Sequence, residues 1–109
     1  MMGPKVISIF SFFNSPEMAV RVKLFASFQE ITGVKEIELE VQDVRGIMNR
    51  IADLFPAMEA ETFTSSGRGE LRPRVKVMVN GRNIDFLDGL DTKVDAKDRI
   101  AVFPPVAGG

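Results

Sequence analysis

The period of the hydrophobic pattern changes twice along the chain, and this limits the folds open to it more than any other feature. Apolar and polar side chains alternate over residues 20–26 and 34–41, as they do in half-buried strands. Over residues 43–55 the apolar side chains instead recur at the spacing of one helical face. Alternation returns over residues 75–79 and 99–103. The sequence therefore predicts two strands, one amphipathic helix and then further strands.

The residues between these segments predict how each one begins and ends. Gly33 lies between the first two alternating runs and indicates a hairpin loop. Asp43 is a predicted helix N-cap, and Pro56 ends the helical segment. Asn80 and Gly81 supply the positive φ angles that a two-residue hairpin turn requires, and a short strand follows them.

One amphipathic helix on one face of a mixed sheet of about five strands is the β-grasp arrangement of ubiquitin-like domains, in the α+β class. We expect this domain to span residues 18–104, followed by a flexible C-terminal segment over residues 105–109. Residues 1–17 form an N-terminal extension, which is either an over-long start or an added edge strand. Residues 57–73 show no period and are rich in Ser, Gly and charge, so we predict a surface loop there.

The composition excludes several classes of function. The chain has no cysteine and no histidine, so it lacks the usual thiolate and imidazole ligands, nucleophiles and general bases, and no metal site is expected. Its net charge of -1 offers no clustered basic excess for nucleic acid. No apolar run approaches the roughly 18 residues of a membrane span. We expect a cytoplasmic protein that is not an enzyme by itself and has neither nucleic acid nor membrane as a partner.

Two aromatic side chains fall on the polar faces of their strands. Phe25 is in register with Arg21 and Lys23, and Phe103 is in register with Arg99. In a β-grasp sheet the first and last strands are neighbours, so the two rings should lie close together. Each ring would contribute roughly 1.5–3 kcal/mol if a partner buried it, which predicts a partner contact. The alternative is that both rings fold back under the helix or the C-terminal segment.

The last strand leads into a tail that is suited to entering the active site of another protein. Prolines lack an N–H donor and fix φ near about -65°, so they end the strand and keep the chain extended. Small residues and glycines then allow close approach of another backbone. The residues of this tail are Pro104, Pro105, Val106, Ala107, Gly108 and Gly109. Its one functional group is the carboxylate of Gly109, which ATP can activate as an acyl-adenylate for attack by sulfur.

The sequence resembles the small subunit of molybdopterin synthase, a ubiquitin-like sulfur carrier, over roughly residues 18–109. The resemblance lies in "VKLFASFQEITG", in "LDTKVDAKDRIAVF" and most specifically in "FPPVAGG". It implies that an E1-like adenylating enzyme uses ATP to adenylate Gly109 and that a sulfur donor converts the adenylate to a thiocarboxylate. The chain itself would bind no cofactor.

The resemblance also implies a partner and a destination for the sulfur. Two small and two large subunits would form the synthase, and the tail would deliver sulfur to a cyclic pyranopterin precursor during molybdenum cofactor biosynthesis. Phe25 and Phe103 match family positions that contact the large subunit. Three alternatives stay open: a sulfur carrier of the thiamine type, a ubiquitin-like modifier conjugated to lysines through Gly109, and an interaction domain with an inert tail.

Overall fold

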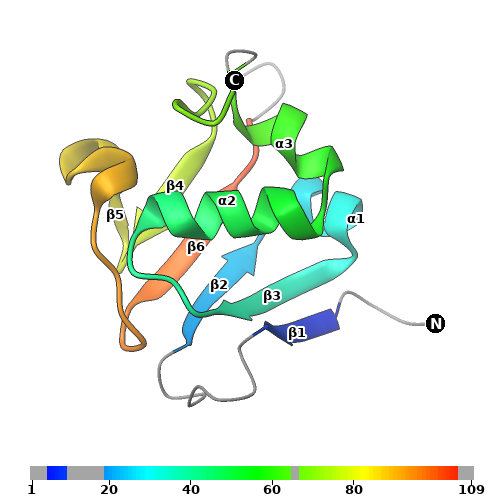
Figure 1. The fold of residues 1–109 in the computed structure, drawn as a ribbon, viewed down its shortest axis with the longest axis horizontal. Helices are drawn as coiled ribbons and strands as arrows, with labels where there is room; N and C mark the ends of the chain where they lie inside the picture. The colour runs from blue at the N-terminus through cyan, green and yellow to red at the C-terminus, as the bar shows by residue number, and fades with distance from the viewer. Residues whose placement is uncertain (1–4, 10–18, 65–66, 106–109) are drawn as a thin grey trace.

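The computed structural model of the protein describes residues 5–9, 19–64 and 67–105, with side chains from residue 19 onward. Its sheet has six strands in the order β1-β3-β2-β6-β4-β5, and helix α2 crosses one face (Figure 1). The strands are β1 (Lys5–Ile9), β2 (Val20–Leu24), β3 (Val34–Leu39), β4 (Lys76–Val79), β5 (Arg82–Asn83) and β6 (Arg99–Phe103). The helices are α1 (Ser27–Thr32), α2 (Val44–Leu54) and α3 (Ala57–Thr62), with the 3-10 turns η2 (Ile84–Phe86) and η3 (Gly89–Asp91).

The pairing of the strands is that of a β-grasp sheet. β2 pairs antiparallel with β3 and parallel with β6, so the first and last strands of the predicted domain are neighbours. β4 pairs antiparallel with β6 on one side and with β5 on the other. The five strands from β2 to β6, with α2 on one face, confirm the predicted fold class (Figure 1).

One further strand, β1, extends the sheet beyond the five predicted strands. It pairs in parallel with β3, with Ile9 opposite Leu39 (Figure 1). Residues 5–9 therefore form an added edge strand, which is one of the two alternatives predicted for this extension. The rest of the predicted extension lies outside the described residues.

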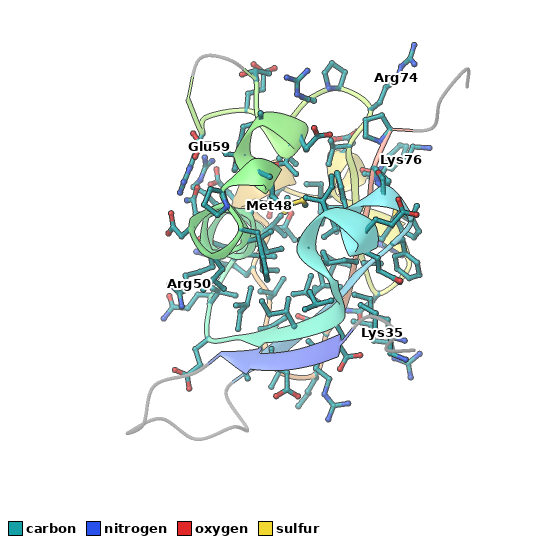
Figure 2. All side chains as sticks on the ribbon, turned by 90° about the vertical axis from the view of Figure 1, so that its right-hand side faces the viewer. Lys35, Met48, Arg50, Glu59, Arg74 and Lys76 are labelled. Atoms are coloured by element: carbon teal, nitrogen blue, oxygen red, sulfur yellow. The ribbon has the colours of Figure 1, made fainter. Side chains whose placement is uncertain are left out.

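The core fills the space between the sheet and α2. Met48 points from α2 into the interior, whereas Arg50 points away from the sheet (Figure 2). Val41 and Phe55, which the pattern also placed inward, are partly buried and pack against this core. The predicted inward residues that are buried are Val20, Val22, Leu24, Ile37, Leu39, Val44, Ile47, Met48, Ile51, Ala52, Val75, Val77, Val79, Ile100 and Val102.

The N-terminus of α2 is capped as the sequence predicts. Asp43 has an extended backbone, and its Oδ1 accepts a hydrogen bond of 2.8 Å from the N–H of Gly46. This bond satisfies one of the N–H groups that a helix start leaves without a partner. Close packing favours glycine at this position, because a Cβ at Gly46 would lie 3.2 Å from the Cβ of Val41. That crowding accounts for a residue of low helix propensity in the first turn.

The antiparallel pairing of β2 and β3 confirms the predicted hairpin, but the connection that contains Gly33 includes the short helix α1 and is not only a loop. Helix α1 buries Phe28 completely. It ends at Gly33, whose φ of 77° is left-handed and whose N–H donates to the carbonyl of Gln29 at 2.7 Å. A six-residue helix with one buried side chain shows no period that a sequence pattern could reveal.

The prediction of a surface loop over residues 57–73 is wrong for its first part. Helix α3 buries Met58 and Thr62 one turn apart, and Phe63 directly after it is also buried. The Thr62 hydroxyl donates to the carbonyl of Met58 at 2.7 Å, which satisfies it inside the core. Phe63 then pairs with Leu71 in an isolated β-bridge. Two inward positions in six residues are too few to set a helical period.

The predicted turn between β4 and β5 is confirmed. Asn80 and Gly81 have φ angles of 54° and 85°, as a tight hairpin turn requires. The Asn80 side chain also joins this turn to the start of β6, because its Nδ2 donates to Asp98 Oδ1 and its Oδ1 accepts from the N–H of Arg99, both at 2.8 Å. The hairpin is therefore fixed to the strand that leads to the tail.

Candidate partner-binding site at the root of the tail

The two aromatic residues singled out from the sequence meet at the ends of β2 and β6. The N–H of Phe25 donates to the carbonyl of Val102 at 3.2 Å, which continues the pairing of these strands by one residue. The rings of Phe25 and Phe103 stack, with centroids 4.5 Å apart and an angle of 10° between their planes. Both side chains are partly buried. Their predicted proximity is confirmed, and their contact with a partner stays a prediction.

A sharp turn follows Phe25 directly. Ala26 has φ 53° and ψ -129°, a conformation that glycine normally supplies at the first central position of a type II′ turn. The turn is closed by the N–H of Phe28, which donates to the carbonyl of Phe25 at 3.1 Å. Gln29 Nε2 also donates to the carbonyl of Leu24 at 2.9 Å. These bonds hold a strained residue directly beside the stacked pair.

The tail leaves the sheet directly after Phe103. Pro104 is buried, so it belongs to the domain and anchors the tail, whereas Pro105 is exposed. Neither proline can donate a backbone hydrogen bond, which explains why β6 ends at Phe103. The other predicted tail residues, Val106, Ala107, Gly108 and Gly109, lie outside the described residues. The aromatic pair therefore marks the place from which the tail departs.

A groove of about 1090 Å³ begins at Phe103 and Pro104 and runs over the outward side chains of the sheet. Lys76 lies on this side of the molecule, opposite the side on which Arg50 projects from α2 (Figure 2). The groove is lined by five basic residues, Arg21, Lys23, Lys76, Lys97 and Arg99. We call it the basic groove.

The local sequence pattern does not predict the basic groove, although most of its basic residues alternate outward along the predicted strands. The basic residues come from β2, β4, β6 and the turn before β6, so the chain shows no basic cluster until the sheet assembles. The strand order of a β-grasp sheet is the one feature from which part of the groove could be predicted. That order puts the outward residues of β2 and β6 on neighbouring strands, although it does not give their register.

The described residues contain no group of three or more His, Cys, Asp or Glu side chains that could hold a metal ion. No helix within the described ranges is both long enough and apolar enough to cross a membrane. The described site offers an aromatic pair and a positively charged groove.

Comparison with known proteins places this geometry in a family. The model of the ThiS family matches residues 22–109. Small archaeal modifier protein 3 of Haloferax volcanii is 40% identical over 96 residues, which cover 84% of this chain and all of that protein.

Solved structures of several proteins resemble the fold. The solution structure of small archaeal modifier protein 1 from Methanosarcina acetivorans has a TM-score of 0.72 and 32% identity, covering 84% of this chain and 97% of that one. A Pyrococcus furiosus protein provisionally described as subunit 1 of a molybdopterin converting factor has a TM-score of 0.61 and 28% identity, covering 82% and 99%. The chain therefore belongs to the ThiS family of ubiquitin-like proteins, which includes sulfur carriers and small modifiers.

Proposed function

We propose that the protein is the sulfur-carrying small subunit of a molybdopterin synthase, acting in the cytoplasm and not catalytic by itself. The observation that carries the proposal is the position of the aromatic pair, which lies where the tail leaves the domain. A partner that buries Phe25 and Phe103 would receive the tail at a fixed point. The motif "FPPVAGG" and the resemblance to a molybdopterin converting factor subunit support the same function.

The chemistry begins with the carboxylate of Gly109. A carboxylate oxygen attacks the α-phosphorus of ATP in the activating enzyme and displaces pyrophosphate, which gives an acyl-adenylate. A hydrosulfide nucleophile then attacks the carbonyl carbon and displaces AMP, which leaves a thiocarboxylate. In the large subunit the thiocarboxylate sulfur would attack a carbon of the pyranopterin precursor and displace an oxygen substituent from that carbon. Hydrolysis of the resulting thioester would leave the sulfur on the pterin and return the carboxylate of Gly109. Two such transfers complete the dithiolene.

A second candidate function is conjugation to proteins. The 40% identity to small archaeal modifier protein 3 favours it. The adenylation step would be the same, but the amine of a target lysine would displace AMP and form an isopeptide bond. The two functions therefore differ only in the nucleophile that attacks the activated Gly109.

Intact-mass analysis tests both functions. The purified protein is incubated with the E1-like enzyme of the same organism, ATP and sulfide. Sulfur transfer predicts a mass increase equal to the exchange of one oxygen for one sulfur, and it also predicts that the large subunit then converts the precursor. Conjugation predicts lysine adducts on other proteins in cell extract.

A variant lacking Gly108 and Gly109 is the control, and it should fold normally but lose both reactions. If this truncated protein still supports formation of the sulfurated pterin, the proposal is wrong.

A further inference from the structure

The basic groove has a defined layout, because the strand registers place its side chains in rows across the sheet. Arg21 lies opposite Arg99, and Lys23 lies opposite Ala101. Across the next pair of strands, Met78 lies opposite Ala101 and Lys76 lies opposite Phe103. The basic side chains therefore surround a floor formed by the small Ala101 and the apolar Met78 and Phe103.

Positive charge predominates in the basic groove although the whole chain carries a net charge of -1. Five basic residues line it, against the two acidic residues Glu36 and Asp98. The carboxylate of Asp98 is already used within the fold, where it accepts hydrogen bonds from Asn80 and from the N–H of Asp95. Among the described residues, no carboxylate lies within 4.0 Å of the charged nitrogens of Lys76 or Arg99. The positive charge is therefore available to a partner.

The position of Arg99 indicates that this charge is not there to stabilise the fold. Like charges directly opposite each other in neighbouring strands are destabilising. Arg21 has a neutralising partner on its other side, where its Nε lies 3.5 Å from Glu38 Oε2. Arg99 faces Arg21 in register and has no such partner in the described structure. An external anion would remove this repulsion.

The floor of the basic groove favours a protein over a nucleic acid as the source of that anion. Met78, Ala101 and Phe103 offer an apolar surface between the charges, which suits an apolar side chain flanked by carboxylates. The groove also begins at Phe103 and Pro104, where the tail is anchored. A protein that takes up the tail therefore meets this surface in the same encounter.

We propose that the basic groove binds a surface of the enzyme that adenylates the tail. That surface would carry an apolar side chain flanked by carboxylates. This inference rests on the proposed function, and it holds equally for sulfur transfer and for conjugation, because both begin with adenylation. Opposite charges on the two surfaces would raise the rate of encounter and hold Gly109 in register with the ATP site.

The test uses a variant that carries Lys76→Glu and Arg99→Glu. Arg99→Glu places a carboxylate opposite Arg21, so the free energy of unfolding measured in urea should not fall because of that change. In ATP-dependent adenylation by the E1-like enzyme, the KM for the variant should rise roughly tenfold or more, with kcat unchanged at saturation. The KM of the unmodified protein should rise with KCl, and that of the variant should change little.

The matched control carries Lys35→Glu and Arg50→Glu, which change the net charge equally but affect exposed residues that do not line the groove. Its KM should match that of the unmodified protein. An unchanged KM for the groove variant, or an equal rise in the control, would overturn the inference while leaving the proposed function intact. Binding of a poly-dT oligonucleotide that only the groove variant loses would also overturn it, in favour of nucleic acid. If the unmodified protein is not adenylated at all, the proposed function and this inference both fail.

Discussion

The ring of Phe25 stacks on the ring of Phe103 with a centroid separation of 4.5 Å and joins the ends of β2 and β6 at the root of the tail. Stacked aromatic pairs contribute beyond the area that they bury. Because both rings are only partly buried, the pair is able to stabilise the sheet and also present a surface to a partner. These two roles can be separated by experiment.

The first prediction concerns the stability of this pair. Phe25→Ala and Phe103→Ala should each lower the free energy of unfolding, and the double variant should lose less than the sum of the two. We expect a coupling energy of about 0.5–1.5 kcal/mol from a double-mutant cycle measured in urea. All three variants should stay folded, because the fully buried core residues are unchanged, but their KM in the adenylation assay should rise. Additive losses in urea would contradict the stacking.

A second prediction concerns the strained residue beside the pair. Ala26 is exposed and has a positive φ, at a turn position where glycine is favoured. Relief of strain of about 1–3 kcal/mol should outweigh the roughly 0.4–1 kcal/mol that a glycine costs through the unfolded chain. Ala26→Gly should therefore raise the free energy of unfolding, as measured in urea. Ala26→Val should lower it, because a β-branched side chain is disfavoured at this φ.

The cap of α2 gives a third prediction. Asp43→Ala removes the acceptor for the N–H of Gly46, so the free energy of unfolding should fall by about 1 kcal/mol. Asp43→Asn keeps an acceptor at the same place, so it should lower the free energy of unfolding by much less. Thermal unfolding followed by circular dichroism distinguishes the two variants. Equal losses would show that the carboxylate acts through its charge, since Lys93 Nζ lies 4.0 Å from its Oδ2.

The sequence predicts α2 and the inward faces of the strands because each has enough residues to show its period. The eleven residues of α2 contain five buried ones. Helices α1 and α3 have six residues each, and burial of Phe28, Met58 and Thr62 by the rest of the fold holds them in place. The local sequence pattern does not reveal such tertiary contacts.

The candidate site, like the fold, can be predicted only in part from the sequence. Strand order alone brings Phe25 and Phe103 together, so their proximity could be predicted. The basic groove depends on which outward side chains face each other, such as Arg21 and Arg99, and this requires the register. The hollow above Ala101 also requires the side chains around it to be in place.

A fourth prediction concerns Arg68, which binds the 67–71 segment to the helices. Its Nη1 lies 2.7 Å from Asp53 Oδ1, and its Nη2 lies 2.7 Å from Glu59 Oε1. Arg68→Ala should speed hydrogen exchange over residues 67–71 and change the urea midpoint little, since exposed ion pairs contribute little to global stability. Arg68→Lys should restore only part of the protection, because an ammonium lacks the planar fork of the guanidinium.

The pH dependence of this contact follows from the charge on Arg68. The hydrogen bonds that Arg68 donates to Glu59 and then to Asp53 raise the pKa of its guanidinium above the ordinary value. A raised folded-state pKa gives a contribution that is complete below the unfolded-state pKa and is lost only as the pH rises through the folded-state value. Deprotonation of Arg68 should therefore not reduce the exchange protection of residues 67–71 between neutral and mildly alkaline pH. A loss in that range that Arg68→Ala abolishes would contradict this.

The final prediction separates the two prolines at the root of the tail. Pro104 is buried and Pro105 is exposed, so Pro104→Ala should lower the free energy of unfolding while Pro105→Gly should leave it unchanged. Pro105→Gly should instead act on binding, because a flexible tail loses more conformational entropy when a partner orders it. Fixing φ with proline is worth about 0.4–1 kcal/mol, so the KM for adenylation should rise roughly two- to fivefold with kcat unchanged. An unchanged KM for Pro105→Gly would show that stiffness at this position does not help the tail to enter its partner.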